Sequence, residues 1–307
     1  MTPSTSRFLK AKALNEWRLF FLLSVPMSVV IALAALRAGI SGVEGVREMI
    51  VFSVRWATPL IFVVTATSAL QVLFPGPLSM WLLRNRKYIG LAFAVAMAWQ
   101  GLFIFIVSFF HRDYYYSDIF VVRDELEGST GYLFLAALVA TSFQKTRQYL
   151  TGKQWKLLHT SGVYFLWAYA FSVYWWNLFY YKNPQAIDHV FYWAGFAAFA
   201  LRIAAWGKKR QQARVKAMQE GAPPSIKAAG VTLISAGAVV AATGLHWQAS
   251  VSTFLTAPSW SATLERWLPY YPFQPFISLF LVGLGTMLVT SAARTADTQQ
   301  LPARSAG

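Results

Sequence analysis

Cysteine is absent from the 307 residues of the chain, and histidine occurs only four times. Without a thiol the chain has no disulfide, no thiolate ligand for haem, no iron–sulfur cluster and no cysteine zinc site. The sequence also has no glycine-rich dinucleotide fingerprint after a strand, so we expect neither an FAD nor an NAD domain. Any cofactor chemistry must therefore depend on very few side chains.

Charged residues are also scarce, at 13% of the chain, against roughly 25% in a soluble domain. Hydrophobic residues make up 56% of the sequence, and the mean hydropathy is +0.43. So apolar a chain needs the lipid bilayer as its solvent. Trp and Tyr are abundant, and they favour the bilayer interface. The composition predicts an all-α, polytopic transmembrane helical bundle.

Crossing the hydrocarbon takes roughly 20 apolar residues. The first of the predicted spans is longer than the apolar core of a signal peptide, so we expect it to be retained. The fourth is the weakest, because its apolar run extends only from Gly131 to Phe143. The predicted spans are eight, at about 17–38, 49–74, 88–110, 130–146, 157–180, 188–206, 228–248 and 274–292.

The net charge of +15 is concentrated in alternate loops. This pattern indicates membrane topology rather than a nucleic-acid surface, and it predicts both termini in the cytoplasm of a multi-pass inner-membrane protein. The basic residues of these segments are Arg7, Lys10, Lys12, Arg84, Arg86, Lys87, Lys145, Arg147, Lys153, Lys156, Lys208, Lys209, Arg210, Arg214, Lys216, Lys227, Arg294 and Arg304. The intervening loops carry the acids Glu44, Glu48, Asp113, Asp118, Asp124, Glu125, Glu127, Asp188 and Glu265.

The two longest loops are too short for a soluble catalytic domain. We expect the inner one, at about 207–227, to be a basic connector that contains Pro223 and Pro224. The outer one, at about 249–273, is rich in Trp, Tyr and Pro. That composition predicts a segment lying at the outer membrane interface.

Five polar side chains within the predicted spans need a physical reason, because uncompensated polar groups are costly in lipid. Arg55 and Arg202 lie near span ends, and we expect both to extend toward the interface. Gln100, Ser172 and Asn177 are neutral. Residues of this kind usually form hydrogen bonds between helices.

Histidine supplies the candidate metal ligands. His159 begins the fifth predicted span, where an imidazole pointing into the bundle is a good ligand for haem iron. The alternative is an interfacial histidine bonded to a headgroup or a backbone carbonyl. His111, His189 and His246 lie at the outer ends of three spans. They can form a metal site only if the fold brings them together.

Two stretches carry a family resemblance. Residues 84–93 read Arg-Asn-Arg-Lys-Tyr-Ile-Gly-Leu-Ala-Phe, and residues 154–159 read Gln-Trp-Lys-Leu-Leu-His, with Tyr164 five residues later. They resemble the openings of the third and fifth helices in ferric-reductase-like transmembrane domains, a group that includes the haem-binding subunit of bacterial methionine sulfoxide reductase systems. Weaker similarities are Arg55-Trp56-Ala57, Thr58-Pro59-Leu60 and Thr141-Ser142.

The resemblance divides the chain into three segments. Residues 50–206 form the ferric-reductase-like core of spans two to six. Residues 1–49 hold the N-terminal segment and the first span. Residues 207–307 hold the basic connector, two additional spans and the C-terminal tail.

In that family, b-type haem is held by histidines on the third and fifth helices. The resemblance makes His159 an inner ligand and Arg86 a partner for a haem propionate. Gln100 lies 14 residues after Arg86, and Ser172 lies 13 after His159, so both lie roughly 20 Å higher. These are the positions of the family's outer histidines. We therefore expect one inner haem and no outer one.

We expect Trp99 and Tyr169 to fill the vacated outer space. No residue is identified for the second axial position of the inner haem. The first hypothesis is thus a membrane oxidoreductase component for electron transport. It would take electrons from a quinol, or from a separate flavoprotein that docks on the basic loops.

Two other hypotheses remain open. A haem-free relative would keep the scaffold as an assembly or regulatory partner, or as a conduit for a small molecule. A transporter or metal-handling protein would use the outer histidines and acids. The lack of a carboxylate deep within any predicted span disfavours the latter.

Overall fold

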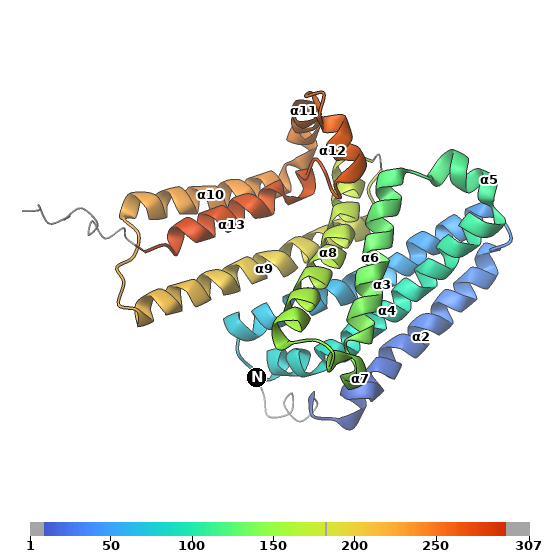
Figure 1. The fold of residues 1–307 in the computed structure, drawn as a ribbon, viewed down its shortest axis with the longest axis horizontal. Coiled ribbons are helices and arrows are strands. Elements are labelled where there is room, and N and C mark those ends of the chain that lie inside the picture. Colours follow the sequence, from blue (N-terminus) through green and yellow to red (C-terminus); the bar gives the residue numbers. More distant parts are fainter. Residues whose placement is uncertain (1–8, 182, 293–307) are drawn as a thin grey trace, which may run out of the picture.

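The computed structural model describes residues 9–181 and 183–292 as helices joined by short turns (Figure 1). Within these residues there is no β-strand, and a single β-bridge joins Gly221 to Ala292. The prediction of an all-α bundle is confirmed. Among the basic residues predicted to lie inside, Arg7, Arg294 and Arg304 fall outside the described residues.

Each predicted span overlaps a helix. These helices are α2 (Glu16–Ala38), α3 (Val43–Leu73), α4 (Pro77–Phe110), α6 (Val122–Ala140), α8 (Gly152–Phe179), α9 (Ala186–Lys216), α10 (Pro224–Ala242) and α13 (Ile277–Val289). The shorter elements are η1 (Lys12–Leu14), α5 (Arg112–Tyr114), η2 (Tyr115–Ile119), α7 (Gln144–Arg147), α11 (Gly244–Thr256), α12 (Ser261–Trp267) and η3 (Gln274–Phe276).

Among the described residues, five helices are both long and apolar enough to cross a membrane: α2, α3, α4, α9 and α10. The chain is therefore a multi-pass membrane protein. Helix α13 has 13 residues and α6 has 19. Helix α8 has 28 residues but carries several Trp and Tyr side chains as well as polar groups. Crossing by these three helices, and hence the total of eight, stays a prediction.

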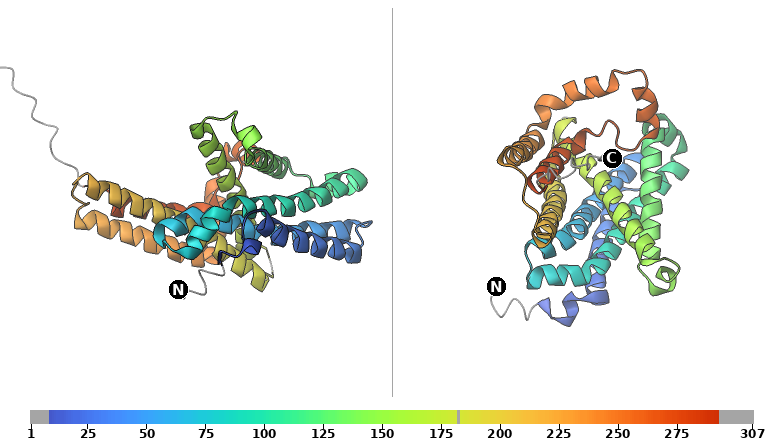
Figure 2. Two further views of the ribbon diagram at one scale, coloured as in Figure 1. Left: turned by 90° about the horizontal axis from the view of Figure 1, so that it is seen from below. Right: turned by 60° about the vertical axis from the view of Figure 1, so that its left-hand side comes forward.

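Helix α3 is the centre of the bundle. It packs against α2, α4, α8 and α9, and many of its buried residues are small, such as Ala57, Thr58 and Thr65. Small side chains let neighbouring helices approach closely. Helix α8 lies between α6 and α9, and α10 and α13 form a hairpin that contacts α9 through α13 (Figures 1 and 2).

The turns alternate between two ends of the bundle. Those after α3, α6 and α9 lie toward the lower left of Figure 1, and we call this the basic end. The turns after α2, α4 and α8, together with α11 and α12, lie toward the upper right, and we call this the acidic end. The two ends correspond to the two predicted sets of loops.

The predicted loop boundaries were wrong at several places. Helix α4 begins at Pro77 and α6 at Val122, so residues 84–87 and 124–127, which were predicted to lie in loops, are helical. Helix α9 continues to Lys216, so most of the expected connector at 207–227 is helical, because its Lys, Arg, Gln and Ala residues favour a helix. The break comes immediately before Pro223 and Pro224, which start α10. The predicted seventh span at 228–248 is too long, since α10 ends at Ala242.

The segment at 249–273 is partly helical, because α11 extends to Thr256 and α12 covers Ser261–Trp267, and its place at the membrane interface stays a prediction. After α11 and α12 it folds back over α6 and α8. The Tyr270 N–H donates to Glu127 Oε1 at 2.8 Å, and the Tyr270 hydroxyl donates to the Phe165 carbonyl at 3.1 Å. The Tyr271 hydroxyl donates to the Leu255 carbonyl at 2.7 Å. We call residues 268–275 the strap.

Helices α10 and α13 pack through glycines. A Cβ atom at Gly285 would lie 2.4 Å from the carbonyl oxygen of Gly230, and one at Gly237 would lie 2.7 Å from that of Ser278. No side chain can be added at such distances without moving the backbones apart. The hairpin therefore depends on these glycines.

Candidate functional site

Three cationic or titratable side chains gather toward the basic end of the core. Arg86 comes from α4, His159 from α8 and Arg202 from α9. Arg86 lies within electrostatic range of both His159 and Arg202. The two residues that the sequence placed at one inner depth thus lie within electrostatic range of each other, and Arg202 lies within range of Arg86. We call these three residues the inner cluster.

Arg202 does not extend toward the interface, so that prediction was wrong. Its Nε donates to the Tyr164 hydroxyl at 2.6 Å, and its Nη1 donates to the Thr65 carbonyl and the Ser68 hydroxyl, both at 3.0 Å. The guanidinium also lies over the Tyr164 ring, 4.6 Å from its centroid. These acceptors on α3 and α8 replace the water that the side chain would otherwise reach.

Arg86 is half-buried and differs from Arg202 in its partners. Among the described residues its guanidinium makes no hydrogen bond, and the ion pairs found there all involve Arg47 or Arg123. The inner cluster therefore contains two guanidinium groups and no compensating carboxylate. Such a cluster favours an anion, because charges removed from water need a partner.

His159 is held by two neighbours. Its Nε2 lies 3.0 Å from the Thr141 hydroxyl, and its ring packs on Trp155 with 4.2 Å between centroids. Because the Thr141 hydroxyl already donates to the Ala137 carbonyl at 2.6 Å, the imidazole is the donor at Nε2. The lone pair then lies on Nδ1. Thr141 belongs to one of the weaker sequence similarities, and the structure gives it this contact.

Gln100 and Ser172 occupy the two acidic-end positions where the resemblance places the family's outer histidines, and neither side chain is free to bind a metal. Gln100 is buried, and its Oε1 lies 3.2 Å from the Tyr132 hydroxyl, which confirms the expected bond between helices. Ser172 instead donates to the Tyr169 carbonyl of its own helix at 2.9 Å, so that expectation was wrong. Neither an amide nor a hydroxyl is a usual haem ligand.

Tyr132 of α6 was missed by sequence reasoning. Its ring lies 3.4 Å from the place where a Cβ of Gly101 would be, so the glycine makes room for it beside Gln100. Trp99, which we expected in this space, turns away and donates to the Ser28 hydroxyl of α2 at 3.0 Å.

Two more of the polar residues singled out in the sequence, Asn177 and Arg55, make contacts at the acidic end. Asn177 of α8 donates to Asp188 of α9 at 3.1 Å, which confirms a bond between helices. Asp188 is buried in the first turn of α9, where it also accepts from the Gln185 N–H at 2.8 Å. Arg55 donates to the Gln185 side chain at 2.7 Å. These contacts tie α3, α8 and α9 together.

The outer histidines do not form a common site in the described part of the chain. His111 follows α4, His189 lies in α9 and His246 lies in α11. Among the described residues, no group of three His, Cys, Asp or Glu side chains is arranged to hold a metal ion. The metal-handling hypothesis therefore receives no support from the arrangement of these residues.

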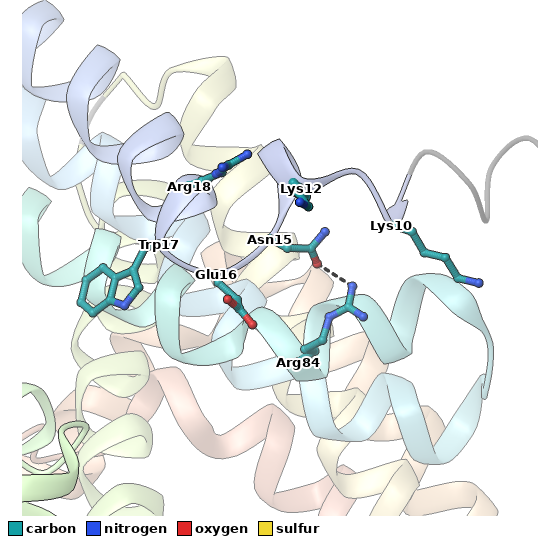
Figure 3. Close-up of a pocket in the computed structure, with 7 residues that line it drawn as sticks. All are labelled: Lys10, Lys12, Asn15, Glu16, Trp17, Arg18 and Arg84. Atoms are coloured by element: carbon teal, nitrogen blue, oxygen red, sulfur yellow. Dashed lines mark hydrogen bonds between the residues drawn. The ribbon is translucent and has the colours of Figure 1, made fainter.

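Several hollows lie on the surface of the described residues. One, of about 600 Å³, lies at the basic end beside η1, where Figure 3 shows Asn15 bonded to Arg84. Its basic side chains point in different directions. An apolar groove of about 710 Å³ lies between α8, α9 and α13, with Tyr164 and Arg202 among its lining residues. The third hollow, at the acidic end, is described below.

Comparison of the chain with protein-family models, with the curated proteins and with the solved structures finds no match. The ferric-reductase-like resemblance therefore rests on the quoted stretches alone. The inner cluster has a donor chemistry that fits one haem, namely one imidazole and two guanidinium groups for the propionates. The Gln100 and Ser172 positions do not fit a second haem.

Proposed function

We propose that this protein is a transmembrane electron carrier of the inner membrane that holds one b-type haem at the inner cluster. The observation that carries the proposal is the pairing of Arg86 and Arg202 beside His159 without a carboxylate. A haem brings two carboxylates and an iron, which together match that set of side chains. In this proposal the chain has eight spans, and both termini lie in the cytoplasm.

The residues of the inner cluster have distinct roles in this account. His159 would hold the iron through an imidazole nitrogen, and Nδ1 is the one that makes no contact with Thr141. Arg86 and Arg202 would pair with the propionates. A bound haem supplies one-electron transfer. Burial and hydrogen bonding by this chain would set its potential.

Two electron donors are compatible with this arrangement. The apolar groove contains Arg202 and Tyr164 and opens along α8, α9 and α13, so a quinol can approach the inner cluster from the lipid. The basic loops can instead attract an acidic flavoprotein. The quinol is favoured, because the groove reaches a member of the inner cluster directly.

A second candidate function is supported by the environment of His159. Its Nε2 is already bonded to Thr141, and Trp155 covers one face of its ring. Tyr132 fills space beside Gln100. These contacts also suit a haem-free relative that serves as a membrane assembly or regulatory partner, or as a conduit.

The absorbance of the detergent-purified protein separates the two candidates. We expect a Soret band in the oxidised protein and sharper bands in the visible after dithionite reduction, because a ligated b-type haem changes its spectrum with oxidation state. Expression should be supplemented with a haem precursor so that supply does not limit loading. Absence of these bands from a folded protein would reject the carrier and leave the haem-free relative.

A further inference from the structure

The acidic-end hollow is a built cavity of about 470 Å³ that the electron-carrier proposal does not use. It lies among α6, α8, α11, α12 and the strap. Its size falls within the usual range for small-ligand sites.

The charged groups of this cavity are not balanced. Asp124, Glu127 and Glu265 supply three carboxylates, and Arg123 supplies the only guanidinium among the cavity's lining residues. The Arg123 guanidinium lies 3.2 Å from Asp124, 3.9 Å from Glu127 and 3.8 Å from Glu265. One positive charge is therefore shared among three carboxylates. Two negative charges remain, which favours a positively charged ligand.

Glu127 is the most enclosed of these acids. Its side chain is 12% exposed, against 59% for Asp124 and 51% for Glu265. Its Oε1 accepts from the Tyr270 N–H at 2.8 Å and lies 3.9 Å from Arg123 Nε, which is closer to Asp124, at 3.2 Å. The carboxylate is therefore incompletely compensated by its protein neighbours. A bound cation would supply the missing charge.

Aromatic rings form much of the remaining wall. Tyr169, Trp176, Tyr180, Tyr181, Tyr270 and Tyr271 line the cavity. The faces of such rings attract cations, and aromatic cages are a common means of binding organic ammonium ions.

Hydrogen bonds from the strap to the neighbouring helices fix the shape of the cavity. The strap is fixed by the bonds of Tyr270 to Glu127 and Phe165 and of Tyr271 to Leu255. The Gln274 side chain adds a bond to the Gln248 carbonyl at 2.9 Å. A site fixed before its ligand arrives loses less entropy on binding.

We infer that this cavity binds a small organic ammonium ion, with Glu127 as the principal counter-charge and the rings of α8 and the strap as its walls. The inference does not depend on haem. It holds for the electron carrier and for a haem-free relative alike.

Titration of the detergent-purified full chain with choline tests this inference by calorimetry. The matched ligand is 3,3-dimethyl-1-butanol, which has the shape of choline but no charge. We expect choline to bind saturably and its neutral analogue to bind roughly tenfold more weakly or not at all. Equal binding of the two would overturn the inference, as would saturable binding of Ca²⁺ or Mg²⁺ that excludes choline.

Three variants locate the site. Glu127→Gln keeps an acceptor for the Tyr270 N–H but removes the charge, and we expect roughly tenfold weaker choline binding. Glu265→Gln removes a more exposed charge and should weaken binding less, with little risk to folding. Glu44→Gln is the control, since Glu44 is 88% exposed and lies in α3, away from the cavity's lining residues. An unchanged affinity in both cavity variants, each shown to be folded, would also contradict the inference.

Discussion

Replacing His159 with Ala is expected to remove most of the haem absorbance from the purified protein. His159 is the only histidine of the inner cluster, so the variant leaves the iron without a protein imidazole. Loss of a direct ligand should weaken haem binding by about a hundredfold or more, since even indirect partners of a ligand contribute roughly 10–100-fold in metal sites. Absorbance spectra of equal amounts of folded protein measure the loss.

Two controls distinguish loss of a ligand from loss of structure. His246→Ala changes an exposed histidine of α11 at the other end of the bundle and should leave the spectrum unchanged. Added imidazole should restore the band in the His159→Ala protein, because it can occupy the vacated ligand position. A haem spectrum that persists unaltered in the folded His159→Ala protein would exclude His159 as the ligand.

Replacing Gly285 with Ala is expected to destabilise the α10–α13 hairpin, although alanine favours a helix more than glycine does. The new Cβ would lie 2.4 Å from the Gly230 carbonyl oxygen and 2.8 Å from the Ile234 side chain. The two helices must then separate along their length. Overpacking of this kind costs about 1–3 kcal/mol. Thermal unfolding in detergent should show a lower Tm.

Gly283 provides the matched control, two residues away in the same helix. A Cβ there would approach nothing closer than the Ile203 side chain at 3.9 Å, which is an ordinary contact. Gly283→Ala should therefore leave the Tm unchanged or raise it, since the helix propensity improves by about 1 kcal/mol. Equal effects of the two substitutions would show that the glycine contact does not hold the hairpin together.

The helices themselves were predictable because long apolar runs carry a strong signal. The positions of the turns were less so. Helix α9 continues beyond the apolar part of the predicted span, which ended at about residue 206, as far as Lys216. It does so because charged residues such as Lys and Arg are good helix formers in water. Hydropathy records where lipid contact ends, whereas a helix ends where its backbone bonding is broken.

The inner cluster was predictable in part. Arg86 and His159 were placed at one depth because both begin predicted spans at the inner side, and the structure puts them within electrostatic range of each other. The partners of Arg202 were not predictable, because Thr65 and Ser68 lie more than a hundred residues away and carry no motif. A buried arginine can reach water or protein acceptors, and the sequence does not distinguish them.

The acidic-end cavity could not be predicted from the sequence. Glu127 appeared as one of several acids in a loop, and Tyr270 as one aromatic residue of an interfacial segment. Their hydrogen bond joins positions 143 residues apart. The charge imbalance and the aromatic wall exist only because the strap folds back over α6 and α8.

The number of haems bound per chain tests the central claim most directly. The pyridine haemochrome assay, combined with quantitative amino-acid analysis of the unaltered protein, gives this ratio. The account predicts one b-type haem per chain, held at the inner cluster, with none at the level of Gln100 and Ser172. A ratio near zero after full haem supply, or a ratio of two, would contradict it.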